Sequence, residues 1–246
     1  MKEEFIKEIE LNKEVKNFNY NNISCVSIMD DNVDKILLYV HGFAADKKWL
    51  YRYRDLFFKY HIGLIAFDLP HHGEDENDKD FSIEECVTYV NEMINYIKET
   101  YHKDIYLLGS SFGTFVILNR LLSKEDDIKY VYFNSPAIDL SESLNMKLGL
   151  DDYFVNHDVF MLHDKLSLTK LFYKEIKDDY ELIKFHKYNN IMIFQGFIDR
   201  TTLYSNAEAF SIKNDLTLVK FDEGKHELFH FEDDMVKMIG EHINNM

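Results

Sequence analysis

The chain has 246 residues, 46% of them hydrophobic, which is enough apolar material for one large core. Its formal net charge of −16 opposes binding to nucleic acid and to an anionic membrane surface, since both would repel it. The opening MKEEFIKEIE lacks the apolar stretch of a secretory signal, and no apolar run reaches the length that a bilayer requires. We therefore expect a soluble protein without nucleic-acid partners or membrane insertion.

The two cysteines, Cys25 and Cys86, lie far apart in the sequence and have no CxxC or histidine-rich context. This pattern predicts two small buried side chains rather than a disulfide or a metal site. Free thiols are typical of a reducing compartment, so we expect a cytoplasmic location.

In chain order, the first thirty residues alternate loosely, which predicts a few antiparallel strands including an edge hairpin. Beyond them, short apolar runs rich in β-branched and aromatic residues predict strands with both faces buried, as in a mostly parallel sheet. These runs lie at 35–40, 62–67, 104–109, 129–134, 190–196 and 216–221.

Between the runs, apolar residues recur every three to four positions, which predicts helices. One is expected over 86–101, a nearly all-apolar one follows Ser111, and a last one has a face running from Leu228 to His242. Alternating strands and helices predict the α/β class, with a mostly parallel central sheet flanked by helices.

Residues 139–188 break this alternation, because their pattern is helical and contains no convincing strand. We predict one domain over residues 1–246, with this segment inserted as a helical cap. Its apolar side chains either close over a pocket or only hold the cap to the sheet; they are Tyr153, Phe154, Phe160, Met161 and Leu162.

A possible nucleophile lies in the sequence LLGSSFGT, where a predicted strand gives way to a predicted helix. Ser111 is the centre of the Gly-x-Ser-x-Gly pattern that runs from Gly109 to Gly113. Small flanking residues allow the sharp turn that raises a nucleophile above a sheet. Ser110 is one residue too early and is expected to point elsewhere. On its own the pattern also fits an ordinary glycine turn.

A second glycine turn follows the predicted strand at 35–40, in the sequence YVHGFAAD. Gly42 allows the backbone to turn tightly, so that the Phe43 N–H and the Phe112 N–H could together stabilise an oxyanion. His41 precedes the turn and is expected to be structural. An ordinary turn is again the alternative.

A serine nucleophile requires an imidazole to take its proton and a carboxylate to orient that imidazole. Asp199 and His226 each follow the carboxyl end of a predicted strand, the edge where parallel sheets place their ligands. The order Ser…Asp…His is the one expected for such a fold. Asp222 lies too close in sequence to His226 to orient it easily.

Together these pieces resemble the α/β-hydrolase superfamily, in particular serine esterase, lipase and aminopeptidase-like members with a small helical cap. The resemblance covers the chain from about Ile36 to the last helix. It rests on the His-Gly turn, the Gly-x-Ser-x-Gly pattern, Gly-x-x-Asp at 196–199 and Gly-x-His at 224–226. Some members of the superfamily take their acid from the strand after the elbow helix, which here would nominate Asp139, but the Gly-x-x-Asp context makes Asp199 the better choice.

The sequence FDLPHHGED also resembles the family's Asp-x-x-Gly-His-Gly segment, with Pro70 and His71 replacing the Gly-His pair. We expect His71 and His72 to pack that loop.

The resemblance implies a serine hydrolase that cleaves a small to medium carboxylic ester through an acyl-enzyme, without cofactor or metal. The partner would be a small-molecule ester. A thioesterase, a small-peptide hydrolase or a C–C bond hydrolase would use the same triad, and a non-catalytic ligand-binding module is the alternative of another class. The sequence makes no prediction about the oligomeric state. The acidic run at 74–80 is expected to be a solvated loop.

Overall fold

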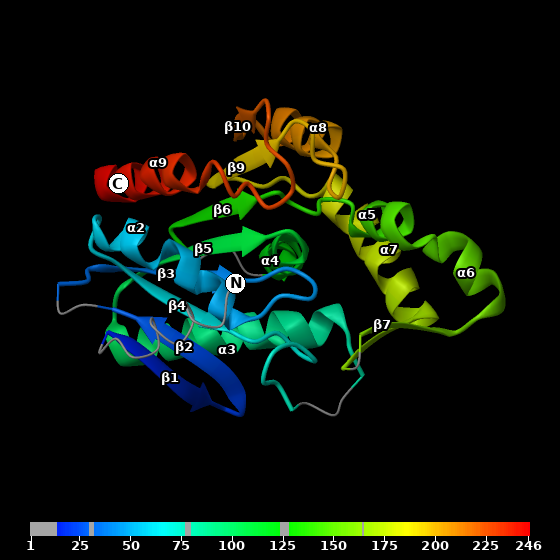
Figure 1. The fold of residues 1–246 in the computed structure, drawn as a ribbon, viewed down its shortest axis with the longest axis horizontal. Helices are drawn as coiled ribbons and strands as arrows, with labels where there is room; N and C mark the ends of the chain where they lie inside the picture. Colours follow the sequence, from blue (N-terminus) through cyan, green and yellow to red (C-terminus); the bar gives the residue numbers. More distant parts are fainter. Residues whose placement is uncertain (1–13, 30–31, 77–79, 124–127, 164) are drawn as a thin grey trace.

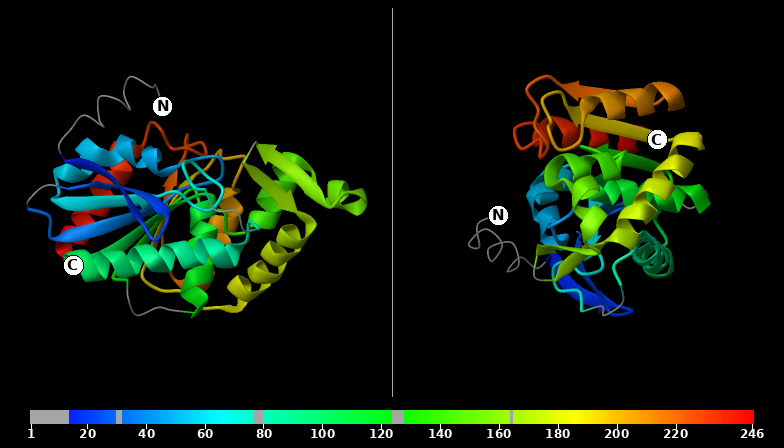
Figure 2. Two further views of the ribbon diagram at one scale, coloured as in Figure 1. Left: turned by 90° about the horizontal axis from the view of Figure 1, so that it is seen from below. Right: turned by 90° about the vertical axis from the view of Figure 1, so that its right-hand side faces the viewer.

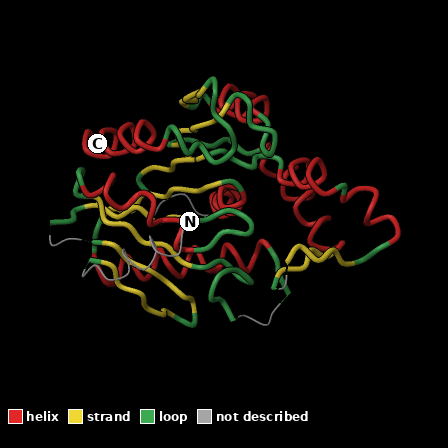
Figure 3. Tube along the Cα trace, viewed as in Figure 1, coloured by secondary structure: helices red, strands yellow, loops and turns green. Residues whose placement is uncertain are grey.

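The computed structural model describes residues 14–29, 32–76, 80–123, 128–163 and 165–246. Within them, eight strands form one sheet in the order β1-β2-β4-β3-β5-β6-β9-β10 (Figures 1 and 3). Their bounds are β1 Val15–Tyr20, β2 Ile23–Ile28, β3 Lys35–Val40, β4 Ile62–Phe67, β5 Asp104–Ser110, β6 Tyr130–Asn134, β9 Ile191–Gly196 and β10 Thr217–Phe221.

The pairing confirms the predicted sheet. The hairpin of β1 and β2 joins it through the antiparallel pair β2–β4, and the strands from β4 through β3, β5, β6 and β9 to β10 are all parallel. The predicted strands agree with the observed ones to within one residue at either end. Any strand expected within residues 1–13 lies outside the described residues.

Helices cover both faces of the sheet. Since successive side chains of a strand point to opposite faces, alternate residues pack against different helices. Ile36 and Leu38 pack with α3 (Ile83–Tyr101), α4 (Phe112–Ser123) and α8 (Tyr204–Asn214). Leu37 and Tyr39 pack on the other face with the 3-10 helix η1 (Lys47–Tyr53), α2 (Arg54–Phe58) and α9 (Glu232–Asn245). The strands from β4 through β3, β5 and β6 to β9 are therefore buried on both sides, as their continuous apolar sequence predicts, whereas the edge strands β1 and β10 are mostly partly or fully exposed.

The last helix is shorter than its predicted apolar face. Leu228 lies before α9, and its φ of 51° places it in a left-handed turn that no α-helix can include. It still packs beneath α9 with Met235, so the apolar periodicity reflects a shared core rather than continuous helix.

The segment between β6 and β9 forms a lobe beyond the ends of the central strands (Figures 1 and 2). We call it the cap lobe; it contains α5 Leu140–Leu148, α6 Leu150–Asn156, β7 Val159–His163, β8 Leu166–Thr169 and α7 Lys170–Phe185. The expectation of a purely helical segment is wrong, because β7 and β8 pair as an antiparallel hairpin. Leu166 and Leu168 alternate with partly exposed neighbours on β8, a strand pattern too short to stand out between helical stretches.

The acidic run at 74–80 is not simply a solvated loop. Glu74 accepts a hydrogen bond from the buried ammonium of Lys47, whose principal partner is the buried carboxylate of Asp68 at 2.6 Å. Asp75 is also buried and accepts a hydrogen bond from Tyr89 at 2.9 Å. These carboxylates therefore anchor the loop after β4. Residues 77–79 of the run lie outside the described part of the chain.

Within the described residues, no helix combines the length and the apolar character that crossing a bilayer requires.

Candidate active site

Ser111 occupies the sharp turn between β5 and α4. Its φ of 50° lies in the left-handed region, which is costly for a residue with a side chain. Surrounding hydrogen bonds hold this conformation: the Ser111 N–H donates to Asn134 at 3.0 Å, and the Ser111 carbonyl accepts from the Thr114 N–H at 3.0 Å. The turn lifts the Ser111 hydroxyl out of the sheet, as the predicted elbow requires.

The two glycines of the elbow are needed because other backbone and side-chain atoms occupy the space of a side chain. A Cβ on Gly109 would lie 2.8 Å from Ile117 Cδ1 on α4. A Cβ on Gly113 would lie 2.1 Å from the carbonyl oxygen of Val40, at the end of β3. Helix α4 can therefore pack closely against both strands only with glycine at these positions.

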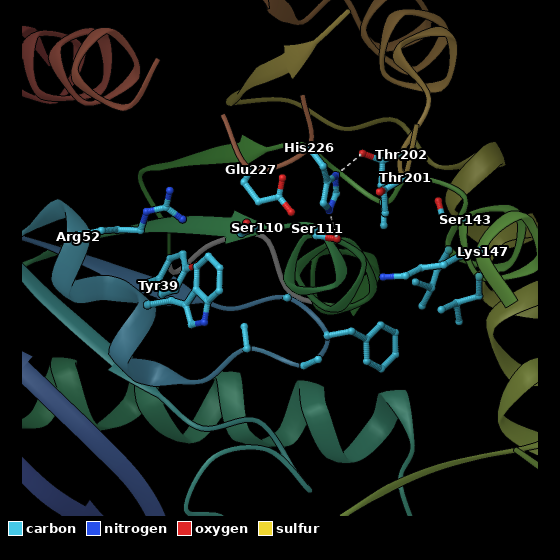
Figure 4. Close-up of a pocket in the computed structure, with 18 residues that line it drawn as sticks. Tyr39, Arg52, Ser110, Ser111, Ser143, Lys147, Thr201, Thr202, His226 and Glu227 are labelled. Atoms are coloured by element: carbon cyan, nitrogen blue, oxygen red, sulfur yellow. Dashed lines mark hydrogen bonds between the residues drawn. The ribbon is translucent and has the colours of Figure 1, made fainter. Parts of the chain in front are cut away.

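His226 connects the serine to an acid. Its Nε2 lies 3.0 Å from Ser111 Oγ (Figure 4). Its Nδ1 lies 2.8 Å from Asp199 Oδ2 and 3.2 Å from the Thr202 hydroxyl. Because the carboxylate can only accept, Nδ1 carries the proton and Nε2 is left to accept from the serine hydroxyl. The structure thus brings together the three residues that the sequence nominated, from the loops after β5, β9 and β10.

Asp199 is buried and receives several hydrogen bonds. Its Oδ1 accepts from the backbone N–H groups of Thr201 at 2.7 Å and Thr202 at 3.0 Å. Its Oδ2 accepts from the Thr202 hydroxyl at 2.8 Å and from Gln195 Nε2 at 3.0 Å. Burial tends to raise the pKa of Asp199, but the hydrogen bond and charge of His226, with the two N–H groups, outweigh it and hold the pKa below its ordinary value.

The loops that carry Asp199 and His226 meet at two glycines. A Cβ on Gly196 would lie 2.3 Å from the carbonyl oxygen of Gly224, so both positions exclude side chains. The Ile198 N–H donates to the same Gly224 carbonyl at 3.1 Å. This backbone contact explains why Asp199 and His226 each follow a glycine, and it fixes the Asp199 loop relative to the His226 loop.

The turn after β3 lies beside the serine. A Cβ on Gly42 would lie 3.2 Å from Ser111 Cβ, and the rings of Phe43 and Phe112 stack with centroids 3.9 Å apart. Phe112 begins α4, where the first backbone N–H groups have no partner within the helix. The two candidate oxyanion donors thus belong to adjoining turns that flank Ser111.

The neighbouring histidines engage the loop after β4. His41 is buried, and its Nε2 accepts from the Leu69 N–H at 3.0 Å while Nδ1 donates to the Gly42 carbonyl. Burial lowers the pKa of His41, so the ring is neutral at pH 7. His72 donates to the Pro70 carbonyl at 2.8 Å, and burial together with His41 lowers the pKa of His72 to about 3. Both rings therefore support the turn as neutral groups.

The other candidates lie in local contacts of their own. Asp139 caps α5 by accepting from the Glu142 N–H at 2.9 Å. His71 contacts the carbonyl of Lys165 on the cap lobe at 3.1 Å. Asp222 is exposed and pairs with Lys220. Asp199 alone among these acids has a recorded hydrogen bond to His226.

A cavity of about 240 Å³ opens above Ser111 and His226. The sheet side and the cap lobe both contribute to its lining (Figure 4). Ser110 also borders the cavity, but its hydroxyl contacts Tyr39, whereas the hydroxyl that meets His226 Nε2 is that of Ser111. Within the described residues, no cluster of three or more His, Cys, Asp or Glu side chains is arranged to hold a metal ion.

Thr202 and Gln195 are the residues that sequence reasoning missed.

We expect Thr202→Val to lower kcat for a short ester about tenfold, because it removes a hydrogen bond to the charged Asp199 carboxylate. Steady-state kinetics, with circular dichroism to verify folding, would measure this. The matched control is Thr201→Val, which keeps its N–H on Asp199 and should change kcat by no more than about twofold. Equal kcat in the two variants would contradict a positioning role for the Thr202 hydroxyl.

The fold and the site together define an α/β protein with a serine, histidine and aspartate at the carboxyl edge of a parallel sheet. Residues 37–205, more than half of the chain, match the model of the alpha/beta hydrolase family. The chain therefore belongs to the alpha/beta hydrolase family.

Individual relatives are distant. The chain is 26% identical over 144 residues to a Mycoplasma genitalium protein named "Putative esterase/lipase 2", a match covering 55% of this chain and 53% of that protein. The chain thus spans about half the length of this curated relative.

Among solved structures, Est1E from Butyrivibrio proteoclasticus with ferulic acid bound has a TM-score of 0.76 at 16% identity, covering 94% of this chain and 98% of that one. A monoacylglycerol lipase from Paleococcus ferrophilus has a TM-score of 0.69 at 17% identity, covering 89% and 97%. At these identities the likeness concerns the fold.

Proposed function

We propose that this protein is a serine hydrolase that cleaves a small to medium carboxylic ester through an acyl-enzyme intermediate. The observation that carries the proposal is the hydrogen-bonded series from Ser111 Oγ through His226 to Asp199, at 3.0 and 2.8 Å. The series faces a cavity, where a substrate carbonyl can approach the serine. Relatives named as esterases and lipases in the same family support an ester as the substrate.

In the first half of the reaction, Ser111 Oγ attacks the acyl carbon while His226 Nε2 takes the hydroxyl proton. Asp199 holds the Nδ1 proton and stabilises the imidazolium as it forms. The N–H groups of Phe43 and Phe112 donate to the oxyanion, each contributing a few kcal/mol to the transition state. His226 then protonates the leaving alcohol, and an ester bond joins the acyl group to Ser111.

In the second half, His226 activates water, which attacks the acyl carbon and releases the carboxylic acid. The cap lobe contributes to the cavity wall through α5, which suits a small substrate rather than a polymer in an open groove.

We also propose that the chain is one domain with this lobe as its cap. The buried free thiols of Cys25 and Cys86 support a cytoplasmic location as a further proposal.

A fluorophosphonate probe distinguishes an enzyme from a ligand-binding module on the same fold. Such probes react fastest with a serine that an adjacent base activates. We expect labelling of one site per chain, with the adduct on the peptide that contains Ser111, as measured by intact-mass and peptide mass spectrometry. A folded chain that takes up no probe would overturn the proposed function.

A further inference from the structure

Three charged side chains line the cavity in addition to the residues of the proposed reaction: Arg52, Glu227 and Lys147. The Arg52 charge is engaged, because its guanidinium forms an ion pair with Glu232 and lies 4.4 Å from the ring centre of Phe229. Glu227 follows His226 and lies on the same side of the cavity as Arg52 (Figure 4). Lys147 lies on the opposite wall.

Lys147 belongs to the face of α5 that forms this wall. Leu140, Ser143, Leu144 and Lys147 all line the cavity, and their spacing of three and four residues places them on one side of a helix. The ammonium group of Lys147 points from α5 into the cavity, toward Ser111 (Figure 4). This wall thus presents two leucines and a serine, and it is positively charged at one end.

The other lysines of the cap lobe that form ion pairs show what Lys147 lacks. Lys177 pairs with Asp151 at 2.5 Å, Lys184 with Glu181 at 2.9 Å and Lys174 with Asp178 at 3.8 Å. Lys147 has no ion-pair or hydrogen-bond partner within the described part of the chain. A cation that faces the cavity without an acidic neighbour is available to a bound anion.

We propose that Lys147 selects esters that carry a carboxylate at the end of the molecule facing α5. This inference rests on the proposed function. The net charge of −16 repels an anionic substrate as a whole, so a local cation is needed to favour its binding. Glu227, on the opposite side of the cavity, disfavours the orientation that would place the substrate carboxylate beside it. The leucines of α5 contact the hydrocarbon between the ester and the carboxylate.

The test compares near-isosteric pairs of esters that differ in charge. In the first pair, monomethyl adipate carries a carboxylate on the acyl side of the ester, and methyl adipamate has a neutral amide in its place. In the second pair, para-acetoxybenzoate carries the carboxylate on the alcohol side, and para-acetoxybenzamide is the neutral counterpart. For at least one pair we expect kcat/KM to favour the carboxylate about two- to fivefold, a range set by the exposure of the Lys147 side chain. High salt should reduce this preference, because it screens the charge.

In Lys147→Gln the ratio of kcat/KM for the carboxylate to kcat/KM for the amide should fall to one or below. Lys147→Arg should retain the wild-type ratio. The matched control is Lys174→Gln, which makes the same charge change in the cap lobe at a residue that does not line the cavity, and it should retain the wild-type ratio. An unchanged ratio in Lys147→Gln for both pairs, with Ser111-dependent cleavage intact, overturns this inference alone. Failure to cleave any ester or to react with fluorophosphonate overturns the proposed function beneath it.

Discussion

Ser111→Ala is expected to lower kcat/KM for a short para-nitrophenyl ester by at least about 10³-fold. The substitution removes the oxygen that forms the proposed acyl-enzyme, while the cavity and the proposed oxyanion donors stay in place. The fold should remain intact, because alanine is smaller than serine and the Ser111 backbone makes the hydrogen bonds that hold the turn. Initial rates, combined with thermal unfolding of both proteins, provide the measurement.

The adjacent serine supplies the matched control. Ser110 is the last residue of β5 and also borders the cavity, yet the hydroxyl that meets His226 Nε2 is that of Ser111. We expect Ser110→Ala to retain activity within about tenfold, the difference reflecting its lost contact with Tyr39. If Ser110→Ala abolished turnover and Ser111→Ala did not, the nucleophile would have been assigned to the wrong residue of the pair.

The middle of the sheet, from β4 through β3, β5 and β6 to β9, was predictable because these strands are buried on both faces and therefore have continuous apolar sequences. The loops with Ser111, Asp199 and His226 were predictable for a different reason. Each follows or contains a glycine that close backbone packing demands, as the contact of Gly196 with Gly224 shows. A steric requirement of this kind leaves a visible trace in the sequence.

The residues that sequence reasoning missed act through contacts between distant segments or through unremarkable neighbours. Gln195 lies in an apolar strand, and nothing in its local sequence indicates that its amide reaches Asp199. Thr202 resembles any loop threonine until the turn brings its hydroxyl to Asp199 Oδ2. Lys147 was recoverable only once the bounds of α5 were known, because its cavity-facing position depends on helical spacing from Leu140.

The close packing of α4 against β3 makes Gly113 the position where the smallest substitution should have the largest structural effect. The added Cβ of Gly113→Ala would approach two backbone carbonyl oxygens, Val40 at 2.1 Å and His41 at 2.7 Å, and neither can move aside as a side chain would. We expect a loss of about 3 kcal/mol in the free energy of unfolding, from overpacking. Urea denaturation would measure this loss, and the melting temperature should fall by roughly 6–12 °C.

Activity should fall together with stability in Gly113→Ala, because the same displacement separates the Phe112 turn from the Gly42 turn, and with them the two proposed oxyanion donors. Gly149→Ala distinguishes this steric effect from a general intolerance of glycine replacement. A Cβ at Gly149 meets no atom within 4 Å, and only its φ of 65° opposes the change, at about 1 kcal/mol. Gly149→Ala should therefore keep full activity at a modest cost in stability. If Gly113→Ala proved as stable as Gly149→Ala, α4 would have room to shift, and the close contact between the two turns would not be a requirement of the fold.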